Sequence, residues 1–444
     1  MVWLFVRVMI SMKNNHNYIY IASINRSGGS LLARLLDGHP DIASYPLELR
    51  YPIAMDVYPF VDYLTGTPRY IREISAEEQV DLLEYFDIPQ QKQDPIYKWG
   101  KERSDPIGVR QNYVEKERYD RVETSFDYHQ YIEDLKSFSP SIKTVQDAYN
   151  AKDIAYFDAW DKGAHKGAMK FVVWHDSGGI FLVDFSQYFE QFQESLVVFP
   201  IRHVFGYIGS EKTRLARRYY GSRRFPKFPM PNILVKHFSA YDLDALIRTW
   251  LVEITRGVLL QEKFGVNDKF LVYRYENLVE RPESVMRYLC EKIQIPFEKT
   301  LLNPTIIGQP WSGSSHQGRQ AGINLGLSNY YREVLTQGEI DKIYERCSPI
   351  LEHLESDIRT PTDLTKIPRD VLYDYEFQKY YSLDKRAWAL YSAFSFNSLR
   401  RTLIGTPNGW ALIAYFYSKF IAIVHVPRLL RQRWFPGRGK QNYT

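Results

Sequence analysis

One short segment near the amino end of the chain combines an arginine, two glycines and two hydroxyl side chains: Asn25-Arg-Ser-Gly-Gly-Ser30. It follows an apolar run, Tyr18 to Ile24, and precedes a leucine-rich run, Leu31 to Leu36. A strand, a glycine-containing loop and a helix start direct backbone N–H groups at one point, where an anion such as phosphate binds. Arg26 adds a planar guanidinium that suits phosphate or sulfate oxygens. The alternative is a strand-to-helix turn without a ligand.

A second group of charged and polar residues follows another apolar run, Leu196 to Ile201. Arg202 stands where this predicted strand ends, and Ser210 and Arg214 are four residues apart, on one face of the helix expected next. At the carboxyl end of a parallel strand such side chains can converge on a phosphate. A solvated helix face is the alternative for Ser210 and Arg214. Two such segments in one chain favour a nucleotide site.

The glycine loop differs from the common nucleotide-binding motifs, because it lacks both the Walker lysine and the G-x-G-x-x-G pattern. It resembles the 5′-phosphosulfate loop of sulfotransferases that use 3′-phosphoadenosine 5′-phosphosulfate (PAPS). That pattern is Lys or Arg, any residue, Gly, two Ser or Thr, and an apolar helix. Gly29 replaces the first hydroxyl residue, so one phosphate contact must come from the backbone alone. The resemblance implies these nucleotide contacts: Arg26, Ser27, Gly28, Gly29, Ser30 and Leu31.

The resemblance extends, patchily, over residues 17 to 355. The spacing Arg-x7-Ser-x3-Arg from Arg202 resembles the 3′-phosphate segment of the tyrosylprotein and related Golgi-type branches. Phe270 to Glu283 resembles the family's later strand and turn, which implies a nucleotide contact at Tyr275. Ile307 to Arg319 resembles the loop that closes over the adenine and the 3′-phosphate, which implies another at Ser314.

Sulfuryl transfer needs a base for the acceptor hydroxyl and positive charge on the transferring group and the leaving phosphate. The resemblance implies that Arg26 holds the 5′-phosphate and stabilises the transferring group, without a metal ion. Tyrosylprotein sulfotransferases place a catalytic Glu one residue away from Glu48, which makes Glu48 a candidate base; a pair with Arg50 or a helix cap is the alternative. Related enzymes place a Lys at His175, which is therefore either a cation on the leaving group or the base.

The elements that must position these residues alternate along the chain. Strands are predicted at 170–174, 196–201 and 270–275, with helical runs such as 243–260 between them. The resemblance implies an α/β, P-loop NTPase-like three-layer fold with a central parallel sheet. Its expected parts are an N-terminal extension (1–16), a sulfotransferase domain (17–355) with an acceptor-side helical insert (50–160), and a helical C-terminal extension (356–444).

Composition agrees with a folded enzyme and excludes little else. The chain has 444 residues, 45% hydrophobic and 25% charged, and a net charge of +5. That charge is too small to indicate nucleic-acid binding, and no nucleic-acid motif is present. Cys290 and Cys347 lack metal-ligand spacing, which predicts buried reduced thiols and fits a cytoplasmic protein. The apolar residues 1–10 are too short to span a bilayer and lack a cleavage site.

Two further segments bear on partners. Residues 409–426 are apolar with Lys419 inside, and a basic flank continues to Lys440. This tail either docks on the protein or a second copy of it, or lies on a membrane surface. Residues 213–228 are rich in Arg and aromatic side chains, which indicates a solvated basic face or an acidic acceptor such as a uronic-acid glycan.

The resemblance implies a PAPS-dependent sulfotransferase of bacterial type, and the low cysteine content favours a cytoplasmic protein, with membrane association left open. The acceptor is expected to be a hydroxyl of a carbohydrate or glycolipid. A tyrosine, small phenol or alcohol acceptor and a non-catalytic nucleotide-binding relative are the alternatives. A P-loop kinase is disfavoured, because the loop has no Walker lysine.

Overall fold

The computed structural model describes residues 16–46, 130, 133–134, 137–138, 145–160, 169–177, 180, 183–219, 231–238, 241–311, 322–323, 329–357 and 359–372. Its centre is a five-stranded sheet in the order β2-β3-β1-β4-β5, with every neighbouring pair parallel. The predicted α/β class with a central parallel sheet is therefore confirmed. The strands are β1 (Asn17–Ser23), β2 (Ile42–Ser44), β3 (Phe171–Ser177), β4 (Leu196–Ile201) and β5 (Phe270–Arg274). A small antiparallel pair, β6 (Thr305–Ile306) and β7 (Gln309–Pro310), lies apart from this sheet.

Helices follow the strands in the order expected for crossover connections. The longer ones are α2 (Gly29–Leu36), α7 (Val145–Asp158), α10 (Val204–Tyr219), α12 (Leu243–Phe264), α14 (Pro282–Lys292) and α16 (Gln337–Ser356). The shorter ones are α9 (Phe185–Gln191), α11 (Asn232–Lys236), α13 (Tyr275–Glu280) and α15 (Tyr331–Val334). Single 3₁₀ turns occur at η5 (Gly265–Asn267), η6 (Lys299–Leu302), η8 (Leu364–Lys366) and η9 (Arg369–Val371).

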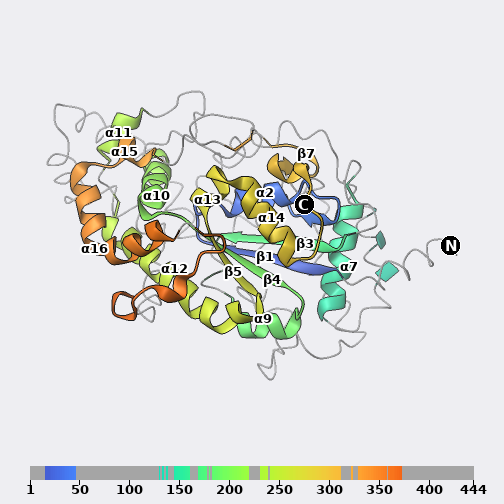
Figure 1. Cartoon of the computed structure of the whole chain (residues 1–444). Coiled ribbons are helices and arrows are strands. Elements are labelled where there is room, and N and C mark those ends of the chain that lie inside the picture. The colour runs from blue at the N-terminus through green and yellow to red at the C-terminus, as the bar shows by residue number, and fades with distance from the viewer. Residues whose placement is uncertain are drawn as a thin grey trace, which may run out of the picture.

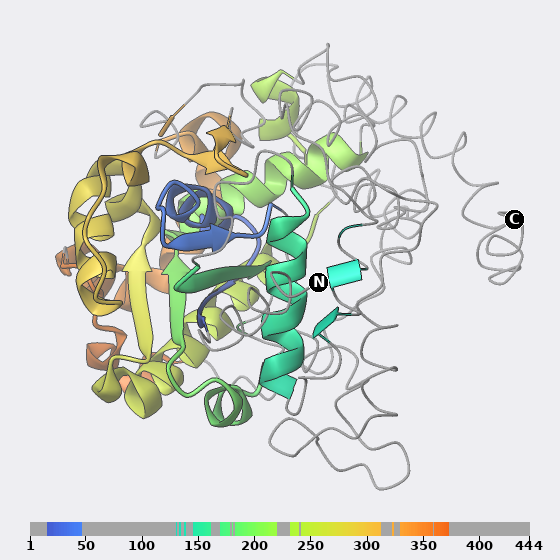
Figure 2. The ribbon, with the colours of Figure 1, turned by 90° about the vertical axis from the view of Figure 1, so that its right-hand side faces the viewer.

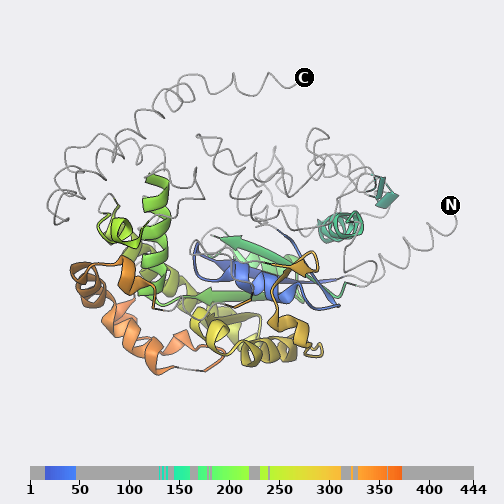
Figure 3. The same ribbon diagram turned by 90° about the horizontal axis from the view of Figure 1, so that it is seen from above.

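Side chains alternate between the two faces of the sheet, and each face has its own apolar cluster. Ile19, Ile21 and Val173 pack with leucines of α2 and with residues of α14. Tyr20 and Trp174 pack on the opposite face with residues of α7, α9, α12 and α16. Figure 1 shows α2, α13 and α14 together beside the sheet, and Figures 1 and 3 show α7 at the other end of the described part from α16; Figure 2 is seen from the α7 end. This three-layer arrangement buries both faces, as parallel sheets require.

Local sequence signals explain several helix boundaries. Asp242 caps α12 through its carboxylate, and Thr336 with Glu339 forms a capping box at the start of α16. Pro282 occupies the first turn of α14, where a missing N–H is tolerated. Polar side chains thus cap the starts of α12 and α16.

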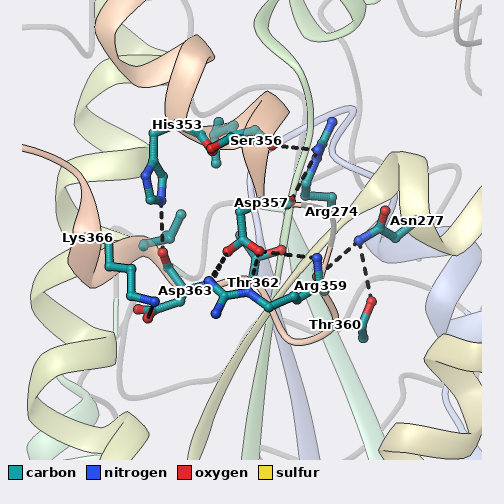
Figure 4. A network of polar contacts seen from close by, with 12 residues as sticks. Arg274, Asn277, His353, Ser356, Asp357, Arg359, Thr360, Thr362, Asp363 and Lys366 are labelled. Carbon is teal, nitrogen blue, oxygen red and sulfur yellow. Dashed lines mark hydrogen bonds and ion pairs between the residues drawn. The ribbon is translucent and has the colours of Figure 1, made fainter.

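The chain after α16 returns to the sheet through a polar network (Figure 4). The carboxylate of Asp357 accepts hydrogen bonds from the backbone N–H groups of Arg359 and Asp363 and from the Arg359 guanidinium. Arg274, at the end of β5, donates to the carbonyl oxygen of Leu354 at 2.6 Å. The N–H of Thr362 then donates to the carbonyl oxygen of Val272 in β5. These bonds hold Asp357 and residues 359–366 beside β5.

Both cysteines are buried and free, as predicted. Burial raises the pKa of Cys290 to about 11 and that of Cys347 to about 12, so both remain thiols at neutral pH. Within the part of the chain that the structure describes, none of the helices has the length and apolarity needed to cross a membrane. The 409–440 segment and most of the 50–160 insert lie outside the described residues.

Candidate functional site

The candidate site lies where four neighbouring strands end. The loop after β1 contains Arg26 to Gly28, His175 is near the end of β3, Arg202 follows β4, and Tyr275 follows β5. Because all these strands are parallel, their carboxyl ends meet at one edge of the sheet. The two predicted phosphate-binding segments therefore lie at the same edge of the sheet, although they are far apart in sequence.

Arg202 links these segments directly. Its Nη1 donates to the backbone carbonyl oxygen of Arg26 at 3.1 Å, and its guanidinium lies 4.5 Å from the centre of the Tyr275 ring. A β-carbon on Gly206 would lie 2.8 Å from Nε of Arg202, so that glycine makes room for the arginine. This Nε is buried and has no hydrogen-bond partner among the described residues. Trp250 fixes the backbone by donating from Nε1 to the Arg202 carbonyl oxygen at 2.8 Å.

Position 28 requires a glycine for two reasons, its backbone conformation and the lack of space for a side chain. Its φ of 95° lies in the left-handed region, which residues with a side chain seldom adopt. A β-carbon there would lie 2.3 Å from Cδ2 of Tyr275. Burial raises the pKa of Tyr275, while the nearby Arg202 opposes this shift, so the ring remains a neutral phenol at physiological pH. Tyr275 therefore supports the loop from below and stacks on Arg202.

Arg26 also adopts a left-handed conformation, with φ 75°. Its carbonyl oxygen is bound by Arg202, and its Nε lies 3.5 Å from Oε1 of Glu211 in α10. A strained backbone persists only where surrounding contacts hold it, and here both ends of the residue are held. The loop arginine is thus positioned by the second predicted segment.

Glu211 joins both predicted phosphate-binding arginines. It is buried, and both of its carboxylate oxygens lie 2.9 Å from Nε of Arg214. Burial disfavours the charged form of Arg214, but the Glu211 carboxylate outweighs this effect and raises the pKa of the guanidinium. Arg214 therefore contacts the loop through Glu211, and its direct contact with a phosphate stays a prediction.

A buried carboxyl group lies beneath the loop. Ser27 donates from its hydroxyl to Oε1 of Glu253 at 3.4 Å, and the Glu253 side chain is fully buried in the middle of α12. Burial raises the pKa of Glu253 well above its ordinary value, although hydrogen bonds from Ser27 and the backbone of Ile24 oppose the shift. Burial thus favours the neutral form of Glu253, which holds the loop without placing a negative charge near it.

His175 lies next to the start of α2. It belongs to β3, which extends to Ser177 rather than ending at residue 174 as the sequence suggests. Its Nε2 lies 3.3 Å from Oγ of Ser23, the last residue of β1, and the side chain is buried. A β-carbon on Gly29 would lie only 2.4 Å from the same nitrogen. His175 and the glycine loop are therefore in direct contact.

The remaining predicted residues fall into two groups. Ser30 and Leu31 are half-buried in the first turn of α2, where Leu31 packs against both apolar clusters, and Ser210 is half-buried on α10 beside Glu211. Glu48 and Ser314 lie outside the described residues, so their roles stay predictions.

Sequence reasoning missed the two acids that hold the loop. Glu211 is next to Ser210 and three residues before Arg214, a spacing at which helical side chains pair. Glu253 interrupts the apolar run Leu251 to Thr255, and an isolated acid in such a run is a signal of a buried functional contact. The contact of Glu253 with Ser27 spans 226 residues, which no local pattern predicts.

This arrangement is suited to binding an anion rather than a divalent cation. The N-terminus of α2, a buried guanidinium N–H and two arginines surround the loop, and the nearest acids either pair with arginine or are neutral. Among the described residues, no group of three His, Cys, Asp or Glu side chains is placed to hold a metal ion.

No family model matches the sequence, and no curated protein does. Solved structures with partial similarity include the sulfotransferase domain of the curacin biosynthetic pathway, at 16% identity and a TM-score of 0.39 over 75% of this chain and 98% of that one. The sulfotransferase domain of the Synechococcus PCC 7002 olefin synthase has 15% identity and a TM-score of 0.37, over 76% and 96% of the two chains. Sulfotransferase STF9 from Mycobacterium avium has 12% identity and a TM-score of 0.31, over 81% of this chain and 82% of that one. Similarity this low carries no argument about function.

Proposed function

We propose that this protein transfers a sulfuryl group from PAPS to a hydroxyl group. The observation that carries the proposal is the 3.1 Å hydrogen bond from Arg202 to the Arg26 carbonyl oxygen. It joins the loop that resembles a 5′-phosphosulfate site to the segment that resembles a 3′-phosphate site. A nucleotide with phosphates at both ends fits such a pair of adjoining anion sites.

Each described residue has a role that follows from its chemistry. Arg26 and the N–H groups at the start of α2 bind the 5′-phosphosulfate, and Arg202 with Ser210 binds the 3′-phosphate. Tyr275 packs against both the glycine loop and Arg202 and so holds them in position relative to each other. His175 approaches from β3 toward the transferring group, as a donor to the leaving oxygen or as the base.

The acceptor is proposed to be a hydroxyl of a carbohydrate or glycolipid, with Glu48 as the second candidate for the base. The support is the basic, aromatic stretch at 213–228, which suits an acidic sugar polymer. A tyrosine or small phenol acceptor is the competing possibility, and an acceptor screen separates the two.

Isothermal titration of the full chain tests the nucleotide assignment. We expect adenosine 3′,5′-bisphosphate to bind in the micromolar range, and ATP with Mg²⁺ to bind at least tenfold more weakly. Radiolabelled PAPS, offered with a panel of glycans, glycolipids and phenols, then tests transfer. Equal affinity for ATP and the bisphosphate would overturn the proposal. Binding without transfer to any acceptor class would favour a non-catalytic nucleotide-binding protein.

A further inference from the structure

Gly29 and His175 occupy one space from two different elements. Gly29 is the first residue of α2. A β-carbon there would lie 2.4 Å from Nε2 and 2.8 Å from Cδ2 of His175, and 2.6 Å from Oγ of Ser23. Real β-carbons do not approach other atoms so closely, so the imidazole, together with the Ser23 hydroxyl, fills the volume that a side chain at position 29 would take.

The sheet explains why the imidazole reaches this place. Successive side chains of a strand point to opposite faces, so His175 points to the face covered by α2 while Trp174 packs on the other face. His175 is paired in register with Ile21 of β1, in the rigid centre of the sheet. Its ring position is therefore set by the fold rather than by a loop.

The chemistry of the ring matches what position 29 lacks. A hydroxyl side chain at a helix start would offer one O–H donor to an anion, and Gly29 offers none. Nε2 of His175 lies 3.3 Å from the Ser23 hydroxyl and beside the same helix start. In the form of the ring that carries its proton on Nε2, with the Ser23 hydroxyl as an acceptor or rotated away, the imidazole offers an N–H at this place.

We propose that Gly29 and His175 are a matched pair, in which His175 supplies the side-chain contact to the 5′-phosphate of the nucleotide and Gly29 is required to admit it. The inference rests on the proposed function, because it assigns a ligand within that site. It makes His175 a residue that distinguishes nucleotides with a 5′-phosphate from those without one.

Titrations with adenosine 3′,5′-bisphosphate and with adenosine 3′-monophosphate test this pair. Wild-type protein should prefer the bisphosphate, and His175→Ala should reduce that preference by about tenfold, as expected for one lost hydrogen bond to a charged group. Affinity for the 3′-monophosphate should stay unchanged. His353→Ala, in α16 and bonded to the Asp363 carbonyl oxygen, is the matched control and should bind as wild type does.

A double variant at positions 29 and 175 tests whether the two residues are matched. Gly29→Ser alone should bind the bisphosphate poorly and unfold at a lower temperature, because the new side chain meets the imidazole. Gly29→Ser combined with His175→Ala should recover both the bisphosphate affinity and the unfolding temperature. The smaller alanine leaves room for the serine, the Ser23 hydroxyl can rotate away, and the new hydroxyl replaces the imidazole as the donor.

Two results would overturn the pair while leaving the proposed function intact: full bisphosphate preference in His175→Ala, or wild-type binding by Gly29→Ser. A wild-type protein that binds neither nucleotide would overturn the proposed function and this inference together. Thermal unfolding of each variant separates a lost contact from a lost fold.

Discussion

The carbonyl oxygen of Arg26 accepts a hydrogen bond from Nη1 of Arg202, across 176 residues of sequence. The bond makes the conformation of the glycine loop depend on the residue that follows β4. Two anion-binding segments that share a structural contact cannot vary independently. Changes at either end are therefore expected to affect both phosphates of a bound nucleotide.

Arg202→Ala should weaken adenosine 3′,5′-bisphosphate binding by about 2 kcal/mol, or about thirtyfold in Kd, because it removes a charged donor and the support of the loop. Arg202→Lys keeps the charge but loses the planar stacking on Tyr275, so it should recover only part of the affinity. Titration calorimetry at fixed salt measures both. Wild-type affinity in Arg202→Ala would show that the two segments do not form one nucleotide site.

Gly28→Ala should destabilise the fold by about 1–3 kcal/mol and abolish nucleotide binding, because the new β-carbon meets Tyr275 and the left-handed φ is strained. Gly338→Ala is a suitable control, since a β-carbon there meets nothing within 4 Å. Chemical denaturation of both variants checks the difference. A Gly28→Ala protein as stable as the control would contradict the close packing of the loop on Tyr275.

Glu253→Gln should change the dependence of stability on pH. The pKa of Glu253 is raised in the folded protein, so its contribution is fully present below the ordinary carboxyl pKa and is lost as pH rises toward the folded value. Glutamine resembles the protonated acid and removes this loss. The variant should therefore be at least as stable as wild type at pH 8, with a smaller stability decrease between pH 5 and pH 8.

Denaturant titrations across that pH range measure the effect. Glu253→Ala, which leaves a cavity and removes the acceptor of Ser27, should be less stable at every pH. A glutamine variant that is markedly less stable than wild type at pH 8 would indicate that the ionised carboxylate is required.

Asp357→Asn should weaken the contact between residues 357–366 and β5. Burial alone would raise the pKa of Asp357, but hydrogen bonds from Arg359 and Asp363 outweigh it and lower the pKa to about 2. The carboxylate therefore stabilises the fold above its unfolded pKa, and this contribution is lost as pH falls through about 2. The stability gap between wild type and variant should be constant near pH 7 and narrow below pH 4. A gap independent of pH would rule out this role.

Sulfuryl transfer should survive a chelator. In the proposed site, Arg26 and the N–H groups at the start of α2 would supply the positive charge that phosphoryl-transfer enzymes obtain from Mg²⁺. Turnover of labelled PAPS in excess EDTA should equal turnover in buffer alone. A loss of activity that added Mg²⁺ restores would assign that charge to a metal ion instead.

Sequence patterns predicted the framework of the site well. The strands before Arg202 and before Tyr275 follow from apolar runs, which are local properties of the chain. The strand Ile42–Ser44 was missed because three residues are too few to show a period.

What the sequence could not show are contacts between distant residues. The identity of Gly28 could be read as a turn signal, but its dependence on the Tyr275 ring could not. Likewise, the sequence shows only that Gly29 differs from the residue in the family pattern. The fold shows that His175 fills the space that a side chain at position 29 would take. Contacts between side chains of distant elements produce no repeating pattern in the sequence, so they cannot be predicted from it.

The placement of residues 359–366 beside β5 has a further consequence. β5 is the last strand of its sheet, and the bond from Thr362 to Val272 occupies one of its backbone carbonyl groups. An uncovered edge strand can pair with strands of other molecules and so promotes aggregation. We therefore expect the returning chain to reduce such pairing at this edge.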